Sequence, residues 1–164
     1  MEREPEVAVT SEGLPVQGLF DRAVAYFNAQ RFFDAHEDWE TLWNDADGDR
    51  RQWLQGLIQF AAGFHHFAWT GKASGFAKLM RQAGEKSGGY SGDTSGIDFD
   101  ALWTDLRPWI EHGTRVDKGA PLRPGPRPAL PVIRYLPGRV PQPLPLEPEV
   151  GEDDDAKGDD DGGA

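Results

Sequence analysis

The sequence predicts an all-α fold: a single bundle of about five helices with a central antiparallel hairpin, followed by an extended proline-rich C-terminal segment. Three observations lead to this fold class. Apolar residues recur every three or four positions through most of residues 16–112, which is the period of a helix. Short stretches rich in glycine, aspartate or serine separate these periodic regions, as turns between helices do. Beyond Gly113, prolines occur every few residues and exclude both helix and central strand.

The first two helices are predicted over residues 16–28 and 32–44, with a short break between them. The first helix has an apolar face at helical spacing, formed by Leu19, Ala23, Tyr26 and Phe27. The second has an apolar stripe that spans about a quarter to a third of its circumference. Its members are Phe32, Ala35, Trp39, Leu42 and Trp43. Both helices are therefore expected to pack one face against the core.

The third helix, predicted over residues 50–69, is the longest and is apolar over most of its circumference. Such a helix is expected in the centre of a bundle. Gly56 and Gly63 recur seven residues apart on one side, so a neighbouring helix can approach closely there. Gly71 follows the last periodic residue and is expected to end the helix as a C-terminal cap.

A fourth helix is predicted over residues 73–86, and a flexible connection follows it. Asp98 is expected to cap a fifth helix that keeps its period through Ile110. Pro108 lies inside this fifth helix and is expected to kink or restart it.

These elements divide the chain into four parts. Residues 1–15 are a loose lead-in, and residues 16–112 form the helical domain. Residues 113–146 form a proline-rich extended segment that wraps the helical body. Residues 147–164 form an acidic tail that is expected to be disordered, because it has almost nothing to bury.

Composition excludes several classes of protein. The chain has 28 acidic and 17 basic residues, and nine of the acidic residues lie from Glu147 onward with a single lysine, Lys157. The rest of the chain has 19 acidic and 16 basic residues, so its charge is nearly balanced. Without cysteine there is no disulfide, thiolate catalysis or cysteine zinc site. Scattered arginines argue against a nucleic acid partner. The absence of a long apolar run or signal peptide argues against a membrane partner and favours a cytoplasmic location.

The second helix carries a polar group at the margin of its apolar stripe. His36 and Glu40 lie one turn apart at this margin, and Glu37 lies further round, towards solvent. An imidazole and a carboxylate four residues apart can converge on one divalent metal ion. A third ligand must then come from another helix. His65, on the apolar side of the third helix, is the better candidate, since His66 shares a polar ridge with Gln55 and Gln59.

The working hypothesis is a divalent-metal or small-molecule site between the second and third helices. Its proposed metal ligands are His36, Glu40 and His65. Gln55, Gln59 and Trp43 are proposed to line the site. If the site is catalytic, we expect hydrolysis by a metal-activated water, with one divalent metal ion as cofactor and Glu37 as the base.

Three alternatives remain open from the residues alone. The same His and Glu residues can form a buried packing network in a non-enzymatic helical interaction or structural module. They can also perform acid–base chemistry without a metal. Finally, the proline-rich segment can be a recognition element that forms a homo-oligomer or binds another protein.

The stretches "FFDAHEDWETLW" and "WLQGLIQFAAGFHHFAWTGKASGFAKLM" resemble the DUF309 family of small bacterial and archaeal proteins, over roughly residues 16–112. The family's His-x-x-x-Glu-x-x-Trp/Tyr motif falls on His36, Glu40 and Trp43, and a following family histidine falls on His65. Family members commonly have arginine and Gly-Asn after that histidine, and this chain departs from that pattern. The resemblance implies an all-α fold, a His/Glu motif suggested to bind metal, and a function that is not established.

Overall fold

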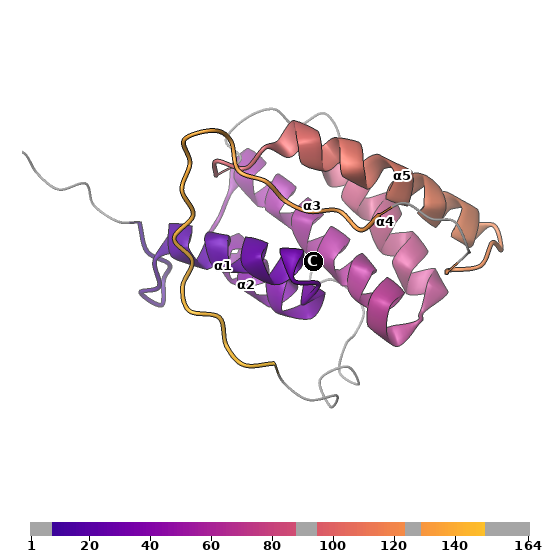
Figure 1. The fold of residues 1–164 in the computed structure, drawn as a ribbon, viewed down its shortest axis with the longest axis horizontal. Helices are drawn as coiled ribbons and strands as arrows, with labels where there is room; N and C mark the ends of the chain where they lie inside the picture. Colours follow the sequence, from indigo (N-terminus) through magenta and orange to yellow (C-terminus); the bar gives the residue numbers. More distant parts are fainter. Residues whose placement is uncertain (1–7, 88–94, 124–128, 150–164) are drawn as a thin grey trace, which may run out of the picture.

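The computed structural model describes residues 8–87, 95–123 and 129–149. Within these ranges the chain forms five α-helices, one short π-helix and no strand (Figure 1). The elements are α1 Val16–Asn28, α2 Phe32–Asn44, α3 Gly48–His65, η1 His66–Thr70, α4 Ala73–Ser87 and α5 Phe99–Asp117. The predicted all-α fold class is therefore confirmed. None of the described helices combines the length and apolar character that crossing a membrane requires.

The third helix ends in a π-turn that the sequence did not predict. The Gly71 amide donates to the carbonyl of His66, five residues earlier, at 2.8 Å. Inside the turn, His66 Nδ1 lies 2.7 Å from Thr70 Oγ1. Gly71 then ends the helix with a φ of 71°, a left-handed conformation that favours glycine. The predicted end point is confirmed, although the last turn is wider than an α-turn.

The helices pack in chain order, and α3 lies between α2 and α4. Two contacts show that α2 and α3 are antiparallel. The ring of Phe33, early in α2, lies 5.4 Å from that of His65 at the end of α3. The guanidinium of Arg51, early in α3, lies 3.8 Å from the Trp43 ring at the end of α2. This confirms the predicted central hairpin.

Glycines bring α3 and α4 close together. A Cβ atom at Gly56 would collide with Ser87 Oγ, and one at Gly63 would collide with Met80 Cε. The close approach predicted from the seven-residue glycine spacing is therefore present, and α4 is the helix that uses it.

The core is strongly aromatic and joins α1, α2, α3 and α5. Phe27 of α1 lies 5.8 Å from Trp39 of α2, measured between ring centroids. Phe64 of α3 lies 5.2 Å from Trp109 of α5 in an edge-to-face arrangement. Trp53 is also fully buried. The aromatic stripes of α3 and α5 are thus core, as the helical periodicity indicates.

Helix α5 begins where predicted, with the Asp98 side chain accepting a hydrogen bond from the Ala101 amide at 3.1 Å. The helix does not restart at Pro108 but continues to Asp117. Trp109, the next residue, is buried, and its indole donates to Ala129 O at 2.9 Å. This packing holds the turn after the proline in place.

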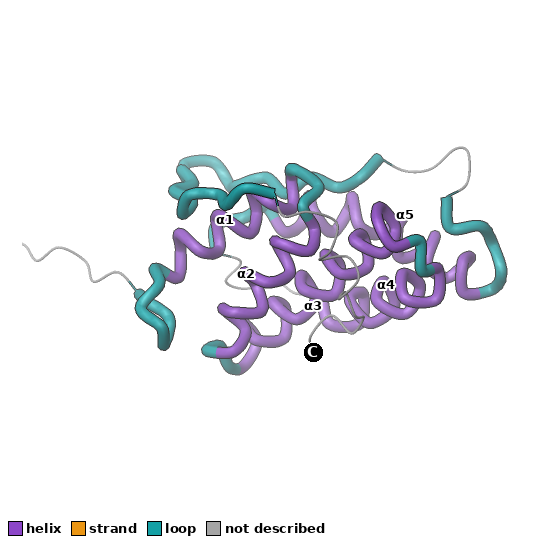
Figure 2. Tube along the Cα trace, turned by 90° about the horizontal axis from the view of Figure 1, so that it is seen from below, coloured by secondary structure: helices purple, strands orange, loops and turns teal. Residues whose placement is uncertain are grey.

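Residues 129–149, called the docked segment below, begin beside α5 and then cross α1 (Figures 1 and 2). The Asn28 side chain exchanges two hydrogen bonds, of 2.9 and 2.8 Å, with the backbone of Ile133. Further along, the Leu144 amide donates to Gly18 O at 3.1 Å. The first seven residues of the predicted lead-in, most of the predicted flexible connection and the acidic tail from residue 150 lie outside the described residues.

Candidate functional site

The His/Glu motif forms a line along the side of α2 that faces α3. His36 Nε2 lies 3.5 Å from Glu40 Oε2. Their side chains are 15% and 36% exposed, so both lie at the edge of the buried stripe, as predicted. Trp43 continues this line and is partly exposed. The antiparallel register places Gln55 of α3 between the Arg51–Trp43 and His65–Phe33 contacts, beside the same line.

Burial keeps His36 neutral. Burial, and to a smaller extent the charge interaction with His65, together lower the pKa of His36 from 6.5 to about 4. The ring of Phe33 lies 5.6 Å from the His36 ring and 5.4 Å from the His65 ring, so it covers both. At neutral pH one His36 ring nitrogen donates and the other accepts, and its contact with Glu40 is not an ion pair.

Several polar atoms of this region are buried and have no hydrogen-bond partner among the described residues. In α2 they include His36 Nδ1, Glu40 Oε2 and Trp43 Nε1, and in α3 they include Gln59 Oε1. A buried polar atom left unpaired costs about 1–3 kcal/mol. The strip formed by α2 and α3 therefore has a hydrogen-bonding capacity that the described chain does not use.

The predicted polar ridge of α3 is largely covered by α4. The Gln59 amide nitrogen donates to Gln82 Oε1 at 3.3 Å. The buried ring of His66 lies against Gly75 of α4. Of the three predicted ridge residues, Gln55 stays partly exposed. The reason is the close glycine-mediated packing of α4, which the helical period of α3 alone does not indicate.

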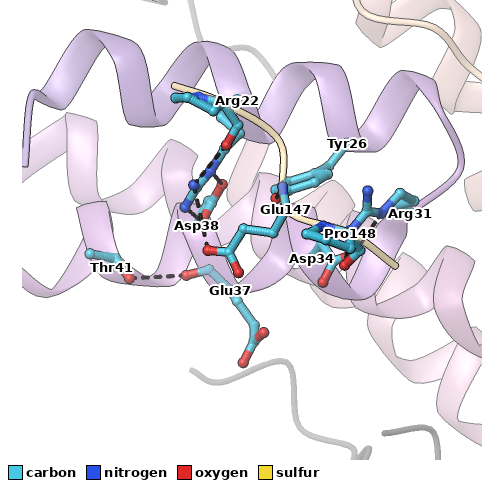
Figure 3. A network of polar contacts seen from close by, with 10 residues as sticks. Arg22, Tyr26, Arg31, Asp34, Glu37, Asp38, Thr41, Glu147 and Pro148 are labelled. Atoms are coloured by element: carbon cyan, nitrogen blue, oxygen red, sulfur yellow. Dashed lines mark hydrogen bonds and ion pairs between the residues drawn. The ribbon is translucent and has the colours of Figure 1, made fainter. Parts of the chain in front are cut away.

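The described residues contain no group of three or more His, Asp or Glu side chains placed to hold a metal ion. His36 and Glu40 are adjacent, and His65 is buried with its ring 5.4 Å from that of Phe33. Glu37 is exposed, and in Figure 3 its side chain points away from the neighbouring cluster around Asp38. The structure thus brings two of the predicted metal ligands together directly.

A model of the family described as "Domain of unknown function (DUF309)" matches residues 20–79. Over this segment, which is less than half of the chain, the sequence is similar to the DUF309 family. The DUF309 segment runs from α1 into α4 and includes every residue of the candidate site, whereas α5 and the docked segment lie outside it. No curated protein matches the chain.

Three neighbours of the site within or near the DUF309 segment were not predicted. Phe33 covers the two imidazoles, Arg51 covers Trp43, and Gln82 pairs with Gln59. Phe33 could have been found, because it lies three residues before His36 and so on the same side of the helix. Arg51 and Gln82 depend on the register between helices, which periodicity does not give.

Proposed function

We propose that the strip formed by α2 and α3 binds a small polar molecule. His36, Glu40 and Gln59 are its hydrogen-bonding groups, and Trp43 is its wall. The observation that supports this proposal is the set of buried polar atoms, contributed by two helices, that have no hydrogen-bond partner in the described part of the chain. Folded proteins pair nearly all their buried polar groups, so several unpaired atoms on one strip favour a polar binding partner from outside the chain.

A packing network explains these residues less well. In such a network the polar groups satisfy one another. Here His36 and Glu40 are 3.5 Å apart, which is longer than a normal hydrogen bond. Gln59 uses its amide nitrogen on Gln82 and leaves its oxygen unpaired. The side chains of His36 and Glu40 are also partly exposed, so the two residues border the protein surface.

The donor and acceptor set indicates the class of ligand. Glu40 and Gln59 offer acceptors, Trp43 offers an N–H donor, and neutral His36 can do either. A small molecule with at least two hydrogen-bond donors, such as a polyol or an amine, matches this set best. A divalent metal ion held by His36, Glu40 and His65, with Glu37 as a hydrolytic base, remains a prediction for the same strip.

The test uses the tryptophan indole N–H signals in a two-dimensional nitrogen–proton NMR spectrum. The chain has six tryptophans, and Trp43→Phe identifies the signal of Trp43. Small polyols and amines are added one at a time. We expect a subset to shift the Trp43 signal, with a dissociation constant that rises at least ten-fold in His36→Ala.

Thr104→Ala, at an exposed position of α5, is the matched control and should bind like the wild type. If no compound shifts the Trp43 signal of the folded protein, the small-molecule proposal fails. A parallel dialysis against Zn²⁺, Mn²⁺, Fe²⁺ and Ni²⁺ separates the metal alternative. Near-stoichiometric metal by mass spectrometry that disappears in His36→Ala would identify the ligand as a metal ion.

A further inference from the structure

The face of α1 under the docked segment is centred on a buried carboxylate. The Asp21 side chain is 0% exposed and accepts hydrogen bonds from four donors. These are Gln17 Nε2 at 3.1 Å, Tyr135 Oη at 2.9 Å, Arg139 Nη2 at 2.8 Å and the Gln142 amide at 2.8 Å. Three of the four belong to the docked segment. A buried carboxylate is costly unless it is well paired, so Asp21 requires a chain with such donors on α1.

Arg22 and Tyr26 of α1, together with Arg31 at the start of α2, hold the end of the docked segment (Figure 3). Tyr26 Oη accepts from the Glu147 amide at 2.9 Å. Arg22 Nη1 donates to the carbonyl of Pro145 at 3.2 Å, and Arg31 Nη2 donates to that of Pro148 at 3.4 Å. All three contacts are with main-chain atoms. Arg22 Nη1 also lies 3.7 Å from Glu147 Oε1, so this region contacts both the backbone and an acidic side chain of the docked segment.

The two arginines are positioned independently of the docked segment. Arg22 forms a two-point ion pair with Asp38, with distances of 2.8 and 3.0 Å. Arg31 pairs with Asp34 at 2.8 Å. Both guanidinium groups also lie over the Tyr26 ring, at 5.7 and 4.5 Å from its centroid. The binding face is therefore preorganised by α1 and α2 and keeps its shape when the segment leaves.

The last part of the docked segment is held mainly by polar contacts. Leu136, Val140 and Leu146 are 44%, 72% and 44% exposed. Leu144 packs against the core at Gly18. A segment with few buried apolar contacts opens at low free energy while the rest of the domain stays folded. Its prolines keep it extended, so little conformational entropy is lost when it binds again.

We propose that this α1 face is a peptide-binding surface that also accepts residues 136–149 of a second copy of the chain. Arg139 and Gln142, which donate to Asp21, and the Glu147 amide, which donates to Tyr26, are supplied to the same face of another copy. The exchange is reciprocal and needs no new type of contact, which is the condition for a symmetric swapped dimer. The α1 face adjoins the edge of α2 that lies opposite the candidate ligand site. The exchange is therefore independent of the proposed function.

The test uses disulfide trapping, because the chain has no cysteine of its own. A Cβ atom at Gly18 would lie 3.2 Å from Leu144 Cγ, so cysteines at these two positions are within reach of a disulfide. Full-length Gly18→Cys and full-length Leu144→Cys are mixed under mild oxidation. We expect a disulfide-linked heterodimer to form at least ten-fold faster than with the collision control, Thr104→Cys mixed with Leu144→Cys.

The double variant Gly18→Cys/Leu144→Cys is the positive control and should close its disulfide within one chain. If it closes but the mixed single variants link no faster than the collision control, the segment does not exchange and the proposal is overturned. A second measurement tests the proposal if the double variant does not close its disulfide. A fluorescent peptide of residues 136–149 should bind full-length Leu144→Asp, and bind more weakly when Tyr26→Phe is added. No binding at about 1 mM peptide to the folded variant likewise overturns the proposal.

Discussion

The pH dependence of folding stability tests the environment that we assign to His36. The perturbation is a change from pH 7.5 to pH 5.0, applied to the wild type and to His36→Gln. Burial, and then the charge of His65, lower the pKa of His36 from 6.5 to about 4. Between these two values the unfolded chain binds a proton that the folded chain does not. The free energy of unfolding therefore falls as the pH drops below 6.5, and this loss levels off below about 4.

The size of the effect follows from the two pKa values. One pKa unit corresponds to about 1.4 kcal/mol, so the full shift of His36 amounts to roughly 3 kcal/mol. At pH 5.0 the folded His36 is still mostly neutral, and about 2 kcal/mol of that stability is lost. The variant His36→Gln lacks this titrating group. The stability of the wild type relative to the variant should therefore be about 2 kcal/mol smaller at pH 5.0 than at pH 7.5.

Urea unfolding followed by circular dichroism at the two pH values measures this difference. Thr104→Ala serves as the control and should keep a constant offset from the wild type. NMR titration of the His36 ring gives the pKa directly, and we expect a midpoint near 4. A midpoint near 6.5, together with an unchanged stability difference, would refute the conclusion that Phe33 and His65 keep this imidazole neutral.

Three further substitutions test the packing and the polar contacts. Gly56→Ala gains about 1 kcal/mol of helix propensity but forces a collision with Ser87, so the free energy of unfolding in urea should fall by about 1–2 kcal/mol. A rise in the free energy of unfolding would mean that α3 and α4 separate easily. Asp21→Asn keeps the shape of the side chain but loses its charge. The free energy of unfolding should fall by about 1–3 kcal/mol, and proteolysis of the docked segment should become faster. Unchanged proteolysis would contradict the role of Asp21 as the anchor of this segment. Thr70→Val removes the hydroxyl beside His66 Nδ1 and should lower the free energy of unfolding by about 1 kcal/mol in urea; no change would show that this contact does not stabilise the π-turn.

The spacing of apolar residues and the positions of helix-breaking residues predicted the helices well, because both are local properties of the chain. Helices α1 and α2 begin and end at the predicted residues, and Gly71 ends the third helix as expected. The glycines of α3 even indicated a close neighbour. Periodicity divides a helix into faces but does not say which neighbour covers each face. Gln59 and His66 were therefore expected in a polar ridge, whereas α4 buries both.

The role of Asp21 could not be predicted for a related reason. An aspartate on an amphipathic helix is normally exposed, and nothing near it in sequence indicates otherwise. Its partners lie far along the chain, and the Gln142 amide is 121 residues away. The prolines of the docked segment predict extended structure but not a path over α1. A buried carboxylate satisfied by such distant donors becomes visible only in three dimensions.

The polar residues of α2 form two pairs that serve different neighbours. Asp34 and Asp38 lie four residues apart and hold the arginines at the α1 face, at 2.8 Å in each case. His36 and Glu40 are also four residues apart, but each follows its counterpart by two residues and so lies about 200° further round the helix. The aspartates are already engaged and offer little to a ligand on the α3 side. His36 and Glu40 face the other way and retain polar atoms without partners among the described residues, so the ligand site that we propose uses that one edge of α2.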